Sequence, residues 1–316
     1  MLFYNYLLLS TIIIFNGVHQ MKIDNVKKIC VIGAGLMGNG IAQVCAQAGY
    51  QVAMRDIEDH FIEKGLSMIN KNLSRGVKKG KMTQDQMNEI LGRIKGTTDL
   101  KEATEGADVV IEAIIENRDL KRKVYTELEE ICDPNVVFAS NTSSISITDM
   151  AAATKRPDKF IGMHFFNPVP VMRLVEIIKG YETSDETYKF IDELSQKLGK
   201  ETVLVNEAPG FAVNRLLLPF FLEAIFTLQE GVTTVEDMDK AITLGLNHPM
   251  GPFTLLDFVG LDTTLFIADY FVTEFQDSKY RVPTLLRKMV RANHLGRKTG
   301  MGFYDYSTNP PTPRSF

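Results

Sequence analysis

The sequence predicts an α/β protein in which a mainly parallel sheet is followed by an all-α domain. Between Lys27 and Val205, short β-branched runs alternate with longer amphipathic segments, which is the pattern of parallel strands joined by crossover helices. Beyond Pro209 the apolar segments have helical periodicity without β-rich runs between them. A chain of 316 residues also exceeds the size at which one core usually gives way to two. We therefore expect a sheet domain over 21–207 and an all-α domain over 208–316.

The first elements are expected to form a βαβ unit. Ile29–Ile32 is a short apolar run typical of a buried strand, and the amphipathic segment 36–48 is closed by Gly49, a common helix end. A second strand at 51–54 leads to Asp56. The later sheet-domain elements are expected as strands at 109–111, 136–138, 160–163, 174–178 and 202–205 and helices at 58–81, 84–94, 120–131 and 186–198. Further helices are expected at 211–229, 235–244, 261–275 and 284–292.

Composition and charge exclude several classes of function. The formal net charge is −4 and no arginine-rich stripe is interleaved with aromatic residues, so nucleic acid is not an expected partner. Cys30, Cys45 and Cys132 lack the paired spacing of a zinc site or a disulfide framework, and we expect no metal. Unpaired cysteines fit a cytoplasmic protein.

The first residues of the chain form an apolar segment of a different kind. Leu2–Phe15 is strongly apolar, but no Lys or Arg precedes Lys22 and no convincing cleavage site follows, which argues against a signal peptide. The segment is also short for a membrane span of about 20 residues. We interpret 1–20 as a non-native or misassigned extension before a start at Met21. Export or anchoring is the alternative, and a membrane is an expected partner only if the extension is genuine.

A glycine-rich turn follows the first predicted strand. Gly33 permits a tight turn, Gly35 allows the backbone to approach a pyrophosphate, and Gly38 allows the helix to pack close to the strand. The anion would then meet the N-terminus of the helix, where unpaired N–H groups favour negative charge. This pattern predicts a Rossmann-type dinucleotide site made of Gly33, Ala34, Gly35, Leu36, Met37 and Gly38.

Asp56 indicates which dinucleotide this site binds. It follows the second strand near the usual interval of about 20 residues after the turn. A carboxylate at this position accepts hydrogen bonds from the ribose hydroxyls and repels a 2′-phosphate, so NAD(H) is favoured over NADP(H). The neighbouring Arg55 could pair with a phosphate, which keeps NADP(H) open.

His164 is the candidate general base for the removal of a proton from a substrate alcohol. It is the only one of the five histidines that ends a predicted strand of the sheet domain, where open α/β sheets place their ligand crevice. A Pro-rich turn follows, and the next strand carries Glu176, which the turn can bring beside the imidazole. The competing interpretation is a surface histidine and an unrelated exposed glutamate.

Five segments carry a resemblance to a known family. In order along the chain, they resemble motifs of the 3-hydroxyacyl-CoA dehydrogenases, most of all the bacterial 3-hydroxybutyryl-CoA dehydrogenases, and they lie at 138–144, 164–176, 209–215, 249–262 and 296–304. The resemblance implies an enzyme that interconverts (S)-3-hydroxyacyl-CoA and 3-ketoacyl-CoA with NAD(H). The five segments occur in the same order as in the family, and together they span nearly all of the chain after Met21.

The resemblance also implies roles for individual residues. His164 corresponds to the general base and Glu176 to its partner, while Ser143 and Asn214 correspond to the polar groups that hold the substrate, and Asn167 to a contact with substrate or nicotinamide. Other correspondences are cofactor contacts at Ser143, Glu116, Lys121 and Lys298, and coenzyme A contacts at Asn72 and Lys79. Without the family, Ser143 would be interpreted as a helix cap, Asn214 as an ordinary helix residue and Lys79 as part of a solvated lysine-rich face.

Two alternative functions remain open on the sequence. One alternative is a dehydrogenase of free β-hydroxyacids, which is disfavoured because such enzymes use a lysine base. Another is a non-catalytic, NAD-binding structural protein of the same family.

Apolar residues on several faces of the helical domain and the family resemblance favour a homodimer. These residues are found at 216–218, 220–222, 225–226 and 265–267.

Overall fold

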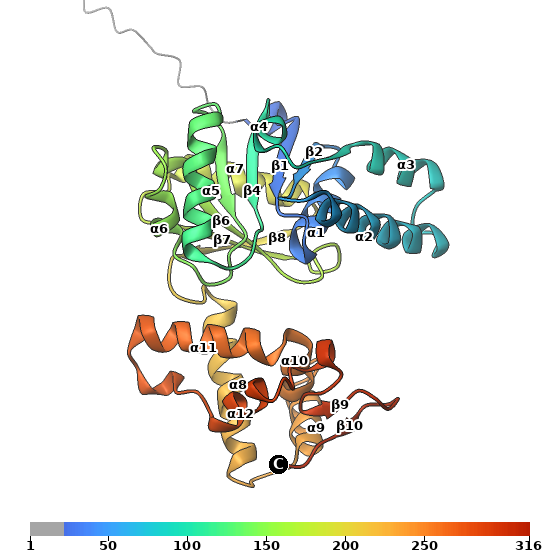
Figure 1. Ribbon diagram of the computed structural model, residues 1–316, viewed down its shortest axis with the longest axis vertical. Coiled ribbons are helices and arrows are strands. Elements are labelled where there is room, and N and C mark those ends of the chain that lie inside the picture. Colours follow the sequence, from blue (N-terminus) through green and yellow to red (C-terminus); the bar gives the residue numbers. More distant parts are fainter. Residues whose placement is uncertain (1–21) are drawn as a thin grey trace, which may run out of the picture.

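The computed structural model describes residues 22–316, and the extension expected at 1–20 lies outside them. Figure 1 shows two bodies, a sheet domain above and a helical domain below, joined by the segment between β8 and α8. The mainly parallel sheet followed by a helical domain is the predicted fold class. No helix within 22–316 is long and apolar enough to cross a membrane.

An eight-stranded sheet forms the centre of the first domain. The strand order is β3-β2-β1-β4-β5-β6-β7-β8, and every neighbouring pair is parallel except β6 and β7, which are antiparallel. The strands are β1 Lys28–Ile32, β2 Gln51–Arg55, β3 Ile94–Thr97, β4 Val109–Glu112, β5 Val137–Ser140, β6 Phe160–Phe165, β7 Leu174–Lys179 and β8 Glu201–Asn206.

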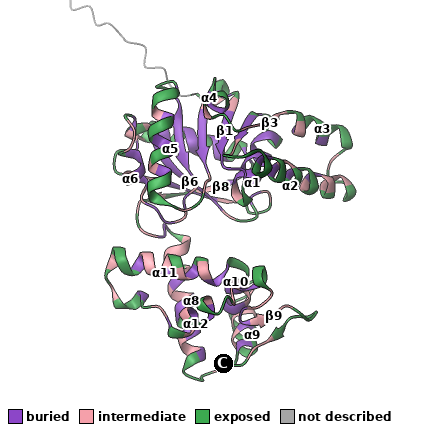
Figure 2. Cartoon of the chain, viewed as in Figure 1, coloured by how far each residue is buried: buried purple, intermediate pink, exposed green. Residues whose placement is uncertain are grey.

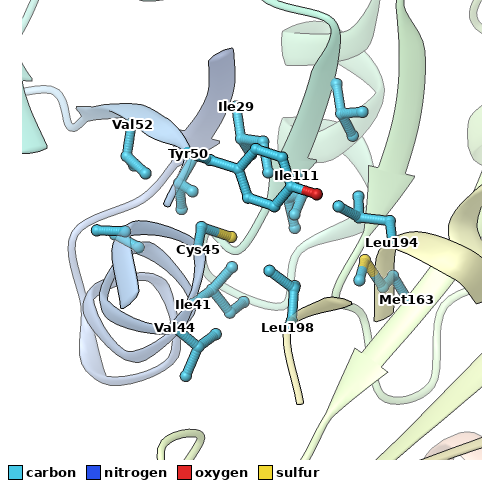
Figure 3. Packing of buried hydrophobic residues seen from close by; sticks show 14 of the residues in the cluster. Ile29, Ile41, Val44, Cys45, Tyr50, Val52, Ile111, Met163, Leu194 and Leu198 are labelled. Carbon is cyan, nitrogen blue, oxygen red and sulfur yellow. The ribbon is translucent and has the colours of Figure 1, made fainter. Parts of the chain in front are cut away.

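Helices cover both faces of this sheet. The helices α1 (Leu36–Gln47), α2 (Asp59–Lys78), α3 (Gln84–Gly92) and α7 (Asp185–Lys197) contribute to one apolar cluster, part of which is shown in Figure 3. The helices α4 (Leu100–Thr104), α5 (Arg118–Ile131) and α6 (Ile147–Ala151) contribute to the other. Alternate residues of β1 point to the two clusters, as the pleat requires.

The second domain is built from five α-helices around its own apolar cluster. They are α8 Val213–Gln229, α9 Val235–Gly245, α10 Pro252–Val259, α11 Leu261–Phe275 and α12 Thr284–Arg291. The chain ends in a small antiparallel pair, β9 (Tyr304–Asp305) and β10 (Thr312–Pro313), a strand element that the all-α expectation did not include. Figure 2 shows the strands of the sheet mostly buried and much of the surface of the surrounding helices exposed.

Several element boundaries differ from the prediction. The helix expected at 84–94 ends at Gly92, and Ile94–Thr97 forms the edge strand β3, because its pairing with β2 outweighs local periodicity. The helix expected at 211–229 begins at Val213, since Gly210 and Phe211 both have positive φ, 78° and 53°. The helices α4 and α10 were not predicted; each has eight residues or fewer, which is too short for a periodic signal. The helix α6, expected to begin near Ile145, begins at Ile147.

Candidate active site

The antiparallel pairing of β6 and β7 places His164 directly opposite Glu176. Side chains at opposed positions of an antiparallel pair lie on the same face, so the two groups meet. The distance from His164 Nδ1 to Glu176 Oε2 is 2.7 Å, and both side chains are buried. An ionised carboxylate can only accept, so Nδ1 carries the ring proton and its N–H donates a hydrogen bond to Glu176. This leaves the lone pair of Nε2 available in the neutral ring.

Glu176 also contacts the second domain. Its Oε1 atom accepts hydrogen bonds from the backbone N–H groups of Ala212, at 3.0 Å, and Val213, at 2.9 Å. These groups belong to the N-terminus of α8, which favours a negative charge. The same carboxylate therefore orients His164 and fixes the start of the helix that carries Asn214.

A cleft of about 340 Å³ lies beside this pair. Its walls come from both domains: His164, Ser143 and Asn167 from the sheet domain and Asn214 from α8. Met37, which belongs to the glycine-rich turn, lines it as well. The rings of Phe166 and Phe211 lie 4.6 and 5.6 Å from the imidazole, so apolar groups flank the candidate base. The arrangement brings a proton acceptor, a serine hydroxyl and amide side chains from both domains to one cleft.

The glycine-rich turn fits a dinucleotide. A Cβ added at Gly33 would lie 2.5 Å from the Ala113 carbonyl oxygen, and one at Gly38 would lie 1.8 Å from the Gly33 carbonyl oxygen, so both positions require glycine. At Gly35 a Cβ would meet nothing within 4 Å, which leaves open space above the turn. The helix α1 starts at Leu36 without a side-chain cap, so its first N–H groups are free for a phosphate.

Asp56 lies against the same turn. Its Oδ2 atom accepts a hydrogen bond of 2.7 Å from the backbone N–H of Ala34. The neighbouring Arg55 donates from Nε to the Thr98 carbonyl oxygen at 3.1 Å, so part of its guanidinium is engaged elsewhere. These contacts place a carboxylate, rather than a free cation, next to the turn.

Two family models match the chain in succession. Residues 28–208 match the model described as 3-hydroxyacyl-CoA dehydrogenase, NAD binding domain, and residues 210–306 match the model of its C-terminal domain. The chain belongs to the 3-hydroxyacyl-CoA dehydrogenase family. It is therefore a member of an NAD-dependent oxidoreductase family, as the sequence motifs predicted.

Individual 3-hydroxyacyl-CoA dehydrogenases match over nearly their whole length. The chain is 50% identical to a probable 3-hydroxybutyryl-CoA dehydrogenase of Bacillus subtilis, over 89% of this chain and 98% of that protein. It is 48% identical to the 3-hydroxybutyryl-CoA dehydrogenase of Clostridioides difficile, over 89% of this chain and 99% of that protein. The crystal structure of (S)-3-hydroxybutyryl-CoA dehydrogenase from Ralstonia eutropha is 49% identical, with a TM-score of 0.86, over 90% of this chain and all of that one.

The loop that carries Ser143 is held by Glu116 in this family member. Glu116 Oε1 accepts hydrogen bonds from Thr142 Oγ1 at 2.6 Å and from the N–H groups of Ser143 and Ser144 at 2.9 and 3.1 Å. Burial raises the pKa of Glu116, but the Lys121 ammonium and these donors outweigh it, so the pKa lies below its ordinary value. Ser143 is not a helix cap, because the following helix α6 is capped by Ser146.

Of the binding residues that the family resemblance implied, four do not line the cleft. Lys121 is buried beneath it, and its Nζ atom lies 2.5 Å from Glu112 Oε1. Lys298 pairs with Asp262 at the start of α11. The coenzyme A candidates lie on or just after α2, which projects from the sheet domain in Figure 1; they are Asn72, which contacts Gln43, and Lys79, which is exposed. The roles expected for these four residues are contacts with the dinucleotide and with coenzyme A, outside the cleft that contains His164.

Two residues that shape the site were not singled out from the sequence. Asn141 lines the cleft, and its Oδ1 atom accepts a 2.8 Å hydrogen bond from the N–H of Phe165, which ties the end of β5 to the end of β6. Lys200 is buried and donates to the carbonyl oxygens of Val169 and Met172, which fixes the loop after Asn167. Asn141 lies inside the segment 138–144 that resembles the family, whereas nothing in the local sequence marks Lys200.

Proposed function

We propose that this protein interconverts (S)-3-hydroxybutyryl-CoA and acetoacetyl-CoA with NAD(H), using His164 as the proton acceptor. The observation that carries the proposal is the buried His164–Glu176 pair, at 2.7 Å, in a cleft shared by the glycine-rich turn and α8. Membership of the dehydrogenase family supports the reaction class, and the names of the relatives support the substrate.

The side chains of the cleft supply the proton chemistry. In the oxidative direction His164 takes the hydroxyl proton, and Glu176 stabilises the imidazolium that forms. Ser143 and Asn214 hold the hydroxyl and the neighbouring carbonyl oxygen. When bound, NAD⁺ accepts the hydride that leaves C3. In the reductive direction the imidazolium returns the proton to the oxygen of the 3-keto group.

A short acyl chain is supported by a second, smaller cavity. It is about 50 Å³ in volume and shares Asn214, Val259 and Ile267 with the main cleft, and its remaining walls include Leu217 and Phe221. At about 10–15 Å³ for each water-sized group, a cavity of 50 Å³ holds only a few carbons. We propose that it receives the end of the acyl chain, which favours four-carbon substrates.

The direct test is the oxidation of NADH on addition of acetoacetyl-CoA, followed by absorbance. Turnover with acetoacetyl-CoA and none with free acetoacetate is expected, and the reverse pattern would indicate a dehydrogenase of free β-hydroxyacids. A series of longer 3-ketoacyl-CoAs tests the chain length, with kcat/KM expected to fall as the chain exceeds four carbons. Absence of any turnover with a well-folded protein would leave only the structural, NAD-binding alternative.

We further propose a cytoplasmic homodimer with a domain division at 207/208. The division is supported by the end of β8 at Asn206 and the start of α8 at Val213. The dimer is supported by large apolar side chains exposed on neighbouring helices of the second domain, Leu216 of α8 and Phe266 of α11. Most of the other apolar residues that suggested a dimer belong to the domain's own core. Three free, buried cysteines support a reducing compartment.

A further inference from the structure

A buried ion-pair cluster lies directly beneath the Ser143 loop. Lys121 of α5 is 1% exposed and Glu112, at the end of β4, is fully buried. The Lys121 Nζ atom lies 2.5 Å from Glu112 Oε1 and 3.4 Å from Glu116 Oε2. The other Glu112 oxygen accepts a 2.7 Å hydrogen bond from Ser140 Oγ. The proposed proton chemistry uses none of these charges, although taking charges out of water is costly.

Glu116 connects this cluster to the cleft. One of its oxygens faces Lys121, and the other gathers donors from three consecutive residues, Thr142, Ser143 and Ser144. The hydroxyl of Ser143 also donates to Glu116, at 3.3 Å. Protonation would place a hydrogen on the oxygen that faces the Lys121 ammonium and would weaken the other oxygen as an acceptor, so this full set of contacts favours the ionised form. The loop geometry therefore depends on the negative charge of Glu116, and that charge depends on Lys121.

We propose that Lys121 is a positioning residue of the active site: with Glu116 it holds the loop that presents Ser143 to the substrate. Its effect on Ser143 is transmitted through this loop, and this role is separate from the cofactor contact that the family resemblance implies for Lys121. The inference rests on the proposed function, because it assigns Ser143 to the substrate. Lys121 faces Glu116 directly and pairs with Glu112 on its other side. The charge of Glu116 also acts on Tyr270, and His164 shares the cleft with Glu116.

The pH dependence of Lys121→Met is the first test. In the wild type Glu116 stays ionised at neutral pH, and its contribution is lost only as the pH falls through its lowered pKa. Without the lysine the burial remains and the compensating cation is gone, so this loss begins at higher pH. The assay is kcat/KM for acetoacetyl-CoA in the reductive direction, in which His164 must be protonated and so causes no loss at low pH. An unshifted acidic limb would overturn the proposal.

A double-mutant cycle with Ser143→Ala is the second test. Lys121→Met alone is expected to lower kcat/KM for acetoacetyl-CoA roughly tenfold to a hundredfold, less than the loss of a direct transition-state donor. In the Ser143→Ala background the same change is expected to cost less than about threefold, because residues that act through one group are not additive. Equal losses in both backgrounds would refute the proposal. So would a higher Kd for NADH with unchanged turnover at saturating NADH, since Lys121 would then be only a cofactor ligand.

Two further variants keep the tests decisive. Lys123→Met is the matched control, because Lys123 lies on the same helix and is 74% exposed; it should match the wild type in both tests. If Lys121→Met does not fold, Glu116→Gln replaces it in the cycle, and its acidic limb should disappear; a retained limb would contradict the proposal. Wild-type protein that does not turn over acetoacetyl-CoA would refute the proposed function, whereas additive variants of an active enzyme would refute only the role of Lys121.

Discussion

Glu176 uses its two carboxylate oxygens for two different parts of the molecule. One accepts from His164 Nδ1 and the other from the first N–H groups of α8. A buried carboxylate has no water to replace a lost donor, so every one of these hydrogen bonds stabilises its charge. The orientation of the imidazole therefore depends on a residue that the second domain itself holds in place.

Replacement of His164 by Gln tests the base at the level of one side chain. The amide keeps the size of the side chain but cannot take a proton, so kcat is expected to fall by about 10²- to 10⁴-fold. Binding of NADH, followed by fluorescence titration, should be retained. The control is His60→Gln, which changes an exposed histidine outside the cleft. Near-normal turnover of the His164 variant would show that another group accepts the proton.

Replacement of Asp56 by Ser tests the choice of cofactor. A serine keeps a polar side chain but no longer carries the charge that repels a 2′-phosphate. Loss of a charged hydrogen bond to the ribose should raise the Kd for NADH about tenfold to a hundredfold. The preference for NADH over NADPH should narrow as well. An unchanged ratio of the two Kd values would show that Asp56 does not select the cofactor.

At the scale of elements, α10 holds the end of the chain. Asp257 of α10 is buried and accepts hydrogen bonds from the N–H groups of Phe303 and Tyr304, both at 2.9 Å, and from the hydroxyl of Tyr306. Burial raises the pKa of this carboxyl despite these donors. Asp239 of α9 binds the N-terminus of α10 and the Tyr304 hydroxyl in the same way. Two carboxylates thus connect α9, α10 and the C-terminal pair of strands.

Replacement of Asp257 by Ala should destabilise the helical domain. Two buried N–H groups lose their acceptor, and each unsatisfied group costs about 1–3 kcal/mol, so a loss of about 3 kcal/mol is expected. The measurement is the midpoint of thermal or urea unfolding compared with the wild type. The control is Asp305→Ala, which removes an exposed acceptor from the same segment. Equal unfolding midpoints for the two variants would contradict the role of Asp257 in holding the C-terminal segment against α10.

At the scale of the whole molecule, the proposed reaction centre lies where the two domains meet. His164 and Ser143 come from the sheet domain and Asn214 from the helical domain, and the contact of Glu176 with α8 connects the two sides of the cleft. Each domain has a separate apolar core. Folding of each domain is thus decided by its own core, while the relative position of the domains decides whether the cleft forms.

A charge introduced at Leu216 tests the proposed dimer. Leu216 is 78% exposed on α8 and Phe266 is 49% exposed on the neighbouring α11, and exposed apolar surface shared by adjacent elements often marks an interface. Leu216→Glu is expected to shift the protein from twice the chain mass toward the monomer mass, as measured by light scattering after gel filtration. Tyr181→Glu is the control, because Tyr181 is 90% exposed on the sheet domain. A monomeric wild type would refute the dimer.

Local sequence patterns were enough to predict the order of the layers and the residues that such patterns mark. Gly33 and Gly38 stand out because their backbone positions exclude a side chain, and the position of His164 follows from the end of a β-rich run. Strand alternation and helical periodicity are local properties, so they can be predicted from neighbouring residues. The family resemblance added Ser143 and Asn214, which no periodicity distinguishes.

Only the tertiary structure decided how distant groups meet. The strand β3 exists because β2 pairs with it, and the second partner of Glu176 is the start of a helix 36 residues away. The cluster of Lys121 with Glu112 and Glu116 sits beneath the cleft although a lysine on an amphipathic helix is ordinarily solvated. Each of these depends on contacts between segments far apart in the chain, and their energies come from burial and pairing that local sequence does not encode.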